Sequence, residues 1–233
     1  MSVGSRAAAE PLRLAHRGDW RLAPENSLAA MQAALRVPGC DGLEVDVRAS
    51  SDGVPILLHD PSLLRVQGID AVPSALTAEE CARHGISTLG EVLTAVGCDP
   101  FLDVELKERV PAVLDVLDLE RGGVDENGAS ELRDAAVSSF DRAILEWLAA
   151  ERPTWPRWLN AFALTDSTIA LAERLGCAAI AARWQAIDET SVRRTHDAGL
   201  GVVAWTVTDL ADYRRLAALG TVAICAESAA LDG

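Results

Sequence analysis

The sequence predicts an α/β fold, a closed (β/α)₈ TIM barrel, and two observations support it. Short apolar runs alternate with longer amphipathic stretches, which is the pattern of repeated strand–helix units. Polar side chains gather at the carboxyl ends of several apolar runs, where the active sites of such barrels form. With 233 residues and 49% hydrophobic content, the chain can bury one barrel-sized core. We expect a single domain over residues 1–233.

Nine apolar runs are candidate strands, one more than a barrel needs. Segment 48–53 is too short to connect parallel strands, which takes about a dozen residues, and Asp52-Gly53 is typical of a hairpin turn. We therefore expect either an antiparallel strand beside this turn or a last run that is not a strand. The candidates are 12–15, 42–47, 54–58, 101–106, 135–138, 158–162, 178–181, 201–207 and 222–225.

The amphipathic stretches between these runs predict helices. Asn26 or Ser27 is expected to cap the first and Asp166 a later one, and Gly176, Gly199 and Gly220 follow helical stretches as C-terminal caps do. Residues 61–87 are polar and irregular, and they predict a small insertion after the third strand, over one end of the barrel. The helices are expected at 27–36, 88–96, 111–119, 141–151, 166–175, 188–198 and 210–219.

The charge and composition of the chain limit the classes of partner that we expect. The formal net charge of −14 disfavours nucleic acid and anionic membranes, but it leaves a small phosphate substrate possible because a local field can oppose the global charge. No apolar run is long enough to span a bilayer, and the N-terminus lacks the apolar core of a secretory signal, so we expect a cytoplasmic protein. The five cysteines are scattered without a CxxC pair, which predicts reduced and mostly buried thiols.

Charged side chains mark four strand ends. Because side chains alternate along a strand, Glu44 and Asp46 share one face, and Glu105 and Lys107 share a face of a later strand. The carboxylates of Glu44, Asp46 and Glu105 would suit a hard divalent ion, Mg²⁺ or Ca²⁺. The alternative is a set of solvated surface acids, which the flanking Val and Leu residues disfavour.

The remaining candidates surround this cluster. His16 and His59 each end a strand, and such a pair can act as general acid and general base near neutral pH. Lys107, the only lysine in the chain, would contact a phosphate oxygen or hold a carboxylate. Arg17 would clamp phosphate or pair with an acid such as Glu25. Trp205 would either wall the substrate pocket or pack in the core.

With these residues in hand, the chain resembles the glycerophosphodiester phosphodiesterase family, from about Leu12 to the C-terminus. The resemblance implies a PLC-like phosphodiesterase barrel. It implies a divalent ion at the three carboxylates, the two histidines as acid and base, and Arg17 and Lys107 on phosphate. It rests on the motifs His16-Arg17-Gly18, Pro24-Glu25-Asn26-Ser27, Glu44-Val45-Asp46-Val47, Asp52-Gly53-Val54-Pro55, His59-Asp60-Pro61, Glu105-Leu106-Lys107, Ser138-Ser139-Phe140-Asp141 and Trp205-Thr206-Val207.

Two segments depart from the family pattern and bear on substrate choice. Thr208 stands where the family often has Asn, and residues 220–227 differ from the family's usual last strand. The function expected is metal-dependent hydrolysis of a small glycerophosphodiester to glycerol 3-phosphate and an alcohol. Lysophospholipase D-like or sphingomyelinase D-like activity is an alternative, as is a non-catalytic ligand-binding barrel. A sugar-phosphate isomerase or aldolase would leave the histidine pair unexplained. The oligomeric state stays open.

Overall fold

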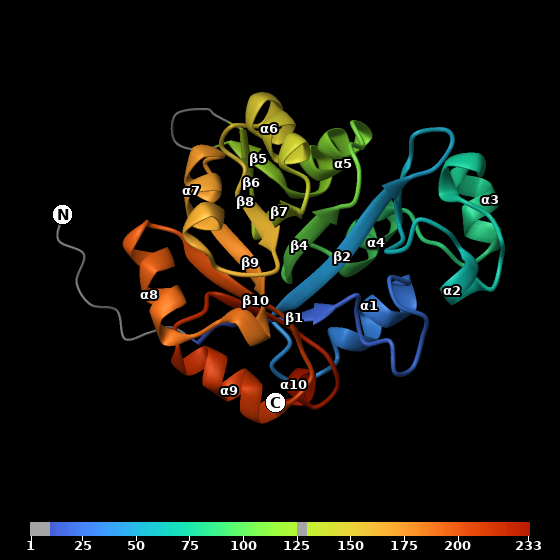
Figure 1. Ribbon diagram of the computed structural model, residues 1–233. Coiled ribbons are helices and arrows are strands. Elements are labelled where there is room, and N and C mark those ends of the chain that lie inside the picture. The colour runs from blue at the N-terminus through green and yellow to red at the C-terminus, as the bar shows by residue number, and fades with distance from the viewer. Residues whose placement is uncertain (1–9, 125–129) are drawn as a thin grey trace.

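The computed structural model describes residues 10–124 and 130–233, and it shows the predicted barrel (Figure 1). Eight parallel strands pair in a ring that closes because β1 pairs with both β2 and β11. In ring order they are β1 (Leu12–His16), β2 (Gly42–Ala49), β4 (Phe101–Leu106), β7 (Ala135–Ser139), β8 (Arg157–Ala161), β9 (Ala179–Arg183), β10 (Gly201–Val207) and β11 (Ala223–Ala226).

The third apolar run, residues 54–58, forms a hairpin strand outside the ring. β3 (Pro55–Leu57) pairs antiparallel with the end of β2, with Val47 opposite Leu57. The intervening turn is closed by Ser50, whose hydroxyl accepts a hydrogen bond from the Val54 amide at 3.0 Å, and Gly53 supplies a positive φ of 78°. The first of the two expected alternatives is therefore confirmed, and the last run is a barrel strand.

All seven expected helices are present and cover the outside of the barrel (Figure 1). Ser27 caps the first of them, but Thr165 rather than Asp166 caps α7, because its hydroxyl reaches the Thr168 amide at 3.2 Å. A short α10 (Ser228–Asp232) follows β11. The covering helices are α1 (Leu28–Ala34), α4 (Leu89–Val96), α5 (Ala112–Arg121), α6 (Arg142–Glu151), α7 (Asp166–Arg174), α8 (Glu189–Asp197) and α9 (Leu210–Ala218).

The helix C-termini and the cysteines are as the sequence predicts. Gly176, Gly199 and Gly220 follow α7, α8 and α9 with positive φ, as expected of C-terminal caps. All five cysteines are free thiols. Within the part of the chain that the structure describes, no helix has both the length and the apolar character that crossing a bilayer requires.

The insertion is more ordered than its sequence indicates. It contains α2 (Leu64–Gln67), a 3₁₀ turn η1 (Pro73–Ala75) and α3 (Ala78–Arg83), which lie beyond the end of β2 (Figure 1). Thr77 and Glu80 form a capping box at the start of α3. Leu63, Cys81 and Ile86 of the segment pack with Ile56 and Leu58, at β3, in a small apolar cluster. A second small sheet, β5 (Gly122–Val124) with β6 (Ser130–Leu132), was not expected from the pattern.

The filling of the barrel interior decides where a cavity can open. Phe101 is the first residue of β4 and Trp158 the second of β8, and their rings stack with centroids 5.7 Å apart at the amino end of the barrel. Small side chains such as Ala136, Ala181 and Ala223 fill much of the remaining interior. The large rings therefore close one end of the barrel, and space for a ligand is left at the carboxyl ends of the strands.

Candidate active site

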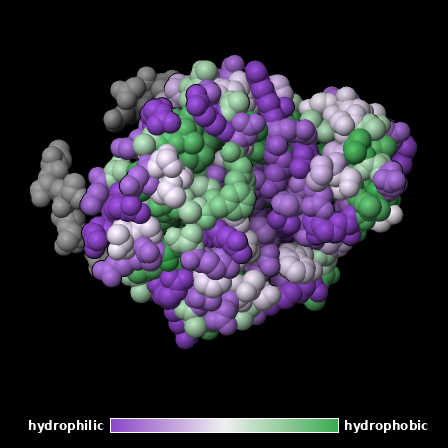
Figure 2. All heavy atoms as spheres, viewed as in Figure 1, coloured by the Kyte–Doolittle hydropathy of each residue, from purple (hydrophilic) through white to green (hydrophobic). Residues whose placement is uncertain are grey.

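A cavity of about 430 Å³ opens at the carboxyl ends of the barrel strands. Its lining includes every candidate residue named from the sequence except Asp46, whose side chain is fully buried just behind it. In Figure 2 polar residues gather over β2, whereas apolar residues lie beside them over the β7–β8 side. The lining members of the predicted set are His16, Arg17, Glu44, His59, Glu105, Lys107 and Trp205.

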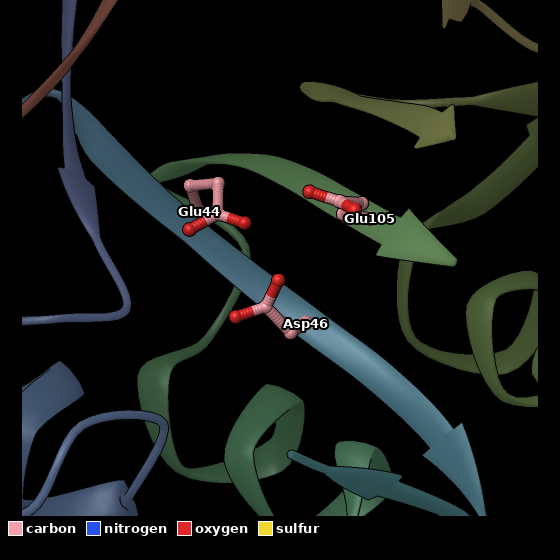
Figure 3. Close-up of side chains that lie close together, drawn as sticks. All are labelled: Glu44, Asp46 and Glu105. Atoms are coloured by element: carbon pink, nitrogen blue, oxygen red, sulfur yellow. The ribbon is translucent and has the colours of Figure 1, made fainter. Parts of the chain in front are cut away.

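Three buried carboxylates converge at one side of the cavity (Figure 3). Glu44 and Asp46 alternate with valines on β2, and Glu105 lies directly opposite Asp46 in the parallel register with β4. One ligand atom from each of the three residues lies within 4.8 Å of the others. All of these donors are carboxylate oxygens, which are the ligands that Mg²⁺ and Ca²⁺ prefer. The residues present therefore fit a divalent ion.

The charge balance of the cluster supports this fit. Burial, with the nearby carboxylates of Asp46 and Glu105, raises the pKa of Glu44 well above its usual value. Burial also raises the pKa of Glu105, and Asp46 adds to that effect. Burial acts in the same direction on Asp46, but the cations of Lys107 and Arg17 outweigh it and hold its pKa at about 2. Two cations thus leave the carboxylates under-neutralised, which is a favourable environment for added positive charge.

The two cations hold the carboxylates in place. Lys107 Nζ lies 2.8 Å from Asp46 Oδ1 and also pairs with Glu105. Arg17 Nε lies 3.0 Å from Asp46 Oδ2, and its Nη1 lies 3.0 Å from Glu25 Oε1, the ion pair expected as its alternative role. The carboxylate-holding role considered for Lys107 is therefore observed. Contact of either cation with phosphate stays a prediction.

The turn that carries Arg17 depends on close backbone packing. Arg17 has φ 59° and Gly18 has φ 79°, and a Cβ on Gly18 would lie 2.6 Å from the carbonyl carbon of Ala30. Asn26, a candidate helix cap, instead fixes Asp46: its Nδ2 donates to Asp46 Oδ2 at 2.8 Å, and its Oδ1 accepts from the Asp46 amide at 3.1 Å. Sequence reasoning missed this role, although Asn26 belongs to one of the motifs.

Each histidine is held by a carboxylate at Nδ1. His16 Nδ1 lies 2.5 Å from Glu227 Oε1, and His59 Nδ1 lies 2.7 Å from Asp60 Oδ1. Burial lowers the pKa of His59, although the anions of Asp46 and Asp60 oppose it. In both rings the hydrogen bond at Nδ1 leaves Nε2 as the nitrogen available for proton transfer.

An arginine of the insertion ties the His59 side together. Arg65 binds Asp60 Oδ2 at 2.5 Å and Glu25 Oε1 at 2.6 Å. Its hydrogen bonds, assisted by His59, lower the pKa of Asp60 to about 2. Neither Arg65 nor Glu227 was a candidate from the sequence: Arg65 lies in a segment without a clear pattern, and Glu227 lies in the segment that departs from the family.

The opposite wall of the cavity is aromatic. Phe140, Phe162 and Trp205 meet with ring centroids 5.4 to 5.9 Å apart, and Trp205 meets each phenylalanine edge-on. Phe140 and Phe162 are 42% and 70% exposed. Trp205 lines the cavity, while its Nε1 donates to the Ala181 carbonyl at 2.9 Å, which fixes the ring. The ring also packs against the interior apolar cluster of the barrel, so Trp205 takes both expected positions, and its contact with a substrate stays a prediction.

The model of the glycerophosphoryl diester phosphodiesterase family matches residues 16–230. The chain belongs to this family. Family membership makes it a phosphoric diester hydrolase, which agrees with the resemblance found in its motifs.

Individual relatives support the assignment. A probable glycerophosphodiester phosphodiesterase 2 of Mycobacterium tuberculosis is 31% identical over 238 residues, which cover 90% of this chain and 86% of that protein. A glycerophosphodiester phosphodiesterase of Caldanaerobacter subterraneus is 33% identical over 113 residues. That second match is partial, because it covers 42% of this chain and 46% of the relative.

Solved structures share the barrel over nearly its whole length. A phosphodiesterase from Oleispira antarctica, in complex with the product sn-glycerol-3-phosphate, has a TM-score of 0.79 and 25% identity, with 93% of each chain covered. The glycerophosphodiester phosphodiesterase of Thermotoga maritima has a TM-score of 0.77 at 24% identity, with 94% of this chain and 95% of that one covered. The latter likeness concerns the fold alone.

Proposed function

We propose that this hydrolase cleaves small glycerophosphodiesters to glycerol 3-phosphate and an alcohol, and that it depends on a divalent ion. The observation that carries the proposal is one cavity lined by two imidazoles next to three converging carboxylates. The similar Oleispira antarctica phosphodiesterase holds sn-glycerol-3-phosphate as its product, which supports the same product here.

Glu44, Asp46 and Glu105 would hold the ion, Mg²⁺ or Ca²⁺. When bound, it would supply positive charge that polarises the phosphoryl group. Arg17 and Lys107 lie against the same carboxylates, so their cations would also face a phosphoryl group bound there. Both would stabilise the negative charge that develops on the phosphoryl oxygens as the leaving alcohol departs.

The histidines would move the protons. One imidazole takes a proton at Nε2 from a substrate hydroxyl or from a water, and the other gives its Nε2 proton to the leaving alcohol. The partners at Nδ1, Glu227 for His16 and Asp60 for His59, keep each ring turned with Nε2 available. Because both rings are held by a carboxylate at Nδ1, these contacts do not distinguish the base from the acid.

The experiment measures glycerol 3-phosphate released from glycerophosphocholine and glycerophosphoethanolamine. The enzyme is assayed in EDTA and again with Mg²⁺ or Ca²⁺ restored. We expect release only with metal, and loss of turnover in His16→Ala and His59→Ala with the fold intact by circular dichroism. Equal release in EDTA contradicts the metal requirement. Metal binding without turnover of either diester favours a non-catalytic barrel.

The aromatic wall supports a second candidate, a lysophospholipase D-like activity. Phe140 and Phe162 expose apolar ring surface at the cavity mouth, which an acyl-bearing substrate would cover. Choline release from lysophosphatidylcholine and from glycerophosphocholine, at equal concentrations, separates the two readings. A higher kcat/KM for the lysophospholipid would favour the second candidate, and a higher value for glycerophosphocholine the first.

A further inference from the structure

We propose that Glu227 is a positioning residue for His16, a role that rests on the proposed function. The contact arises where the barrel closes. β1 and β11 pair in parallel register up to Ala15 opposite Ala226, so the next residues are His16, which ends β1, and Glu227, which directly follows β11. Their side chains meet with His16 Nδ1 and Glu227 Oε1 2.5 Å apart.

The backbone around Glu227 is firmly held. Its amide donates to the Val207 carbonyl at 2.9 Å, and its own carbonyl accepts from the Ala230 amide at 3.1 Å. Glu227 also occupies the N-cap position of α10, yet its side chain makes no capping hydrogen bond. A capping side chain usually accepts a hydrogen bond from its own helix. Here the carboxylate turns instead to the imidazole.

The contact fixes which face of His16 meets the substrate. A carboxylate accepts a hydrogen bond from Nδ1–H, so the neutral ring keeps its lone pair on Nε2. Nε2 lies 3.4 Å from the Thr206 hydroxyl and 3.8 Å from Glu44 Oε2, on the side of the carboxylate cluster. Rotation of the ring would take Nε2 out of the cavity, and misplacement of about 1 Å can lower a rate about 100-fold.

At Nδ1, His16 is held by a carboxylate that has fewer other partners than the carboxylate that holds His59. Asp60 is shared with Arg65, which also bridges to Glu25, so that several side chains hold the His59 region. Among the residues that the structure describes, Glu227 has His16 as its one ion-pair partner. The two side chains are only 15% and 16% exposed, so little water can replace the lost contact. Removal of Glu227 should therefore free the ring.

Steady-state kinetics of Glu227 variants test whether this residue positions His16. Glu227→Ala should lower kcat about 10- to 100-fold with little change in KM or in the metal concentration that restores activity. Glu227→Gln should recover most of the loss, because the amide oxygen can still accept a hydrogen bond from Nδ1–H. Glu146→Ala, which breaks an exposed pair with Arg142 on α6, is the matched control and should keep full activity.

A double-variant comparison separates positioning from a general structural effect. If Glu227 acts through the imidazole, Glu227→Ala should lower activity in the wild type but not lower the residual activity of His16→Ala further. A loss of the same size in both backgrounds overturns the proposal. So does full kcat in the folded Glu227→Ala enzyme.

A spectroscopic readout needs no turnover. The chain has four histidines, and ¹⁵N-labelled imidazoles report which ring nitrogen carries the proton. We expect the signal that disappears in His16→Ala to show the Nδ1–H form in the wild type and in Glu227→Gln, and a mixture of forms in Glu227→Ala. An unchanged His16 signal in Glu227→Ala contradicts the proposal. If the wild type hydrolyses no diester while the signal shifts as expected, the proposed function fails and the contact stands.

Discussion

The two sides of the cavity are built differently. On the side of β1, β2 and β4, charged side chains from different elements meet one another: Asp46 alone contacts Arg17, Asn26 and Lys107. On the side of β7, β8 and β10, three rings touch one another, and two are open to solvent. These contacts fix the positions of the charged groups, as bond making and breaking at a phosphate requires. The aromatic side offers only surface, which suits recognition of an alcohol.

The largest effect is expected when a charge is removed from the charged side of the cavity. Asp46→Asn deletes a proposed metal ligand and weakens both of its cation pairs, so turnover of glycerophosphocholine should fall by on the order of 10³-fold at saturating Mg²⁺. Asp115→Asn, at an exposed position of α5, is the matched control. Comparable activity of the two variants would remove the basis for the contrast between the sides.

Metal addition should stabilise the charged side measurably. An ion at 100 times its dissociation constant adds about 2.7 kcal/mol to the free energy of unfolding, which raises Tm by about 5 to 10 °C in a chain of this size. Differential scanning fluorimetry in EDTA and in excess Mg²⁺ or Ca²⁺ measures the shift. The shift should vanish in Asp46→Asn and persist in Asp115→Asn. A Tm that no divalent ion moves would count against the proposed site.

The free energy of unfolding should depend on pH through Asp103, which lies next to this cluster on β4. Burial, joined by the charges of Glu105 and Asp46, raises its pKa from 3.8 to about 7. Because the folded pKa is the higher one, its stabilising contribution is complete below about pH 4 and is lost as the pH rises through 7. From pH 5 to pH 8 the wild type should therefore lose about 2 to 3 kcal/mol relative to Asp103→Asn.

Urea unfolding in EDTA at the two pH values measures this difference. EDTA is needed because a bound ion would change the charge balance around Asp103. Asp115→Asn serves again as the control, and its stability relative to the wild type should be the same at both pH values. A constant difference between wild type and Asp103→Asn would show that this buried carboxyl does not titrate with folding.

The smallest effect is expected on the aromatic side. Phe162→Ala removes one exposed ring from the wall, so KM for glycerophosphocholine should rise about 2- to 5-fold with kcat nearly unchanged. Leu119→Ala, at a similarly exposed apolar position on α5, should change neither constant. A fall of kcat in Phe162→Ala by tenfold or more would mean that the ring also positions the reacting phosphate.

The sequence predicted what depends on local alternation. Period-two alternation in β2 put Glu44 and Asp46 on one face, and the same rule brought Glu105 to them once the strands paired in register. The link between His16 and Glu227 depends on barrel closure across 211 residues, which no local pattern encodes.

Other missed contacts have similar causes. Arg65 reaches Asp60 and Glu25 from an insertion whose helices are too short to show a period. The cap of α7 was misplaced by one residue because Thr165 and Asp166 are both good capping residues, and only the backbone geometry distinguishes them.

Lys107 has a practical consequence for chemical labelling. It is the only lysine of the sequence, its side chain is 13% exposed, and Asp46 and Glu105 outweigh burial to raise its pKa. Only a neutral amine reacts with an acylating reagent, so this buried ammonium should stay unmodified while the cavity is intact. A single added mass on the tryptic peptide that contains residue 107 would therefore report opening of the barrel mouth, without any substrate or engineered probe.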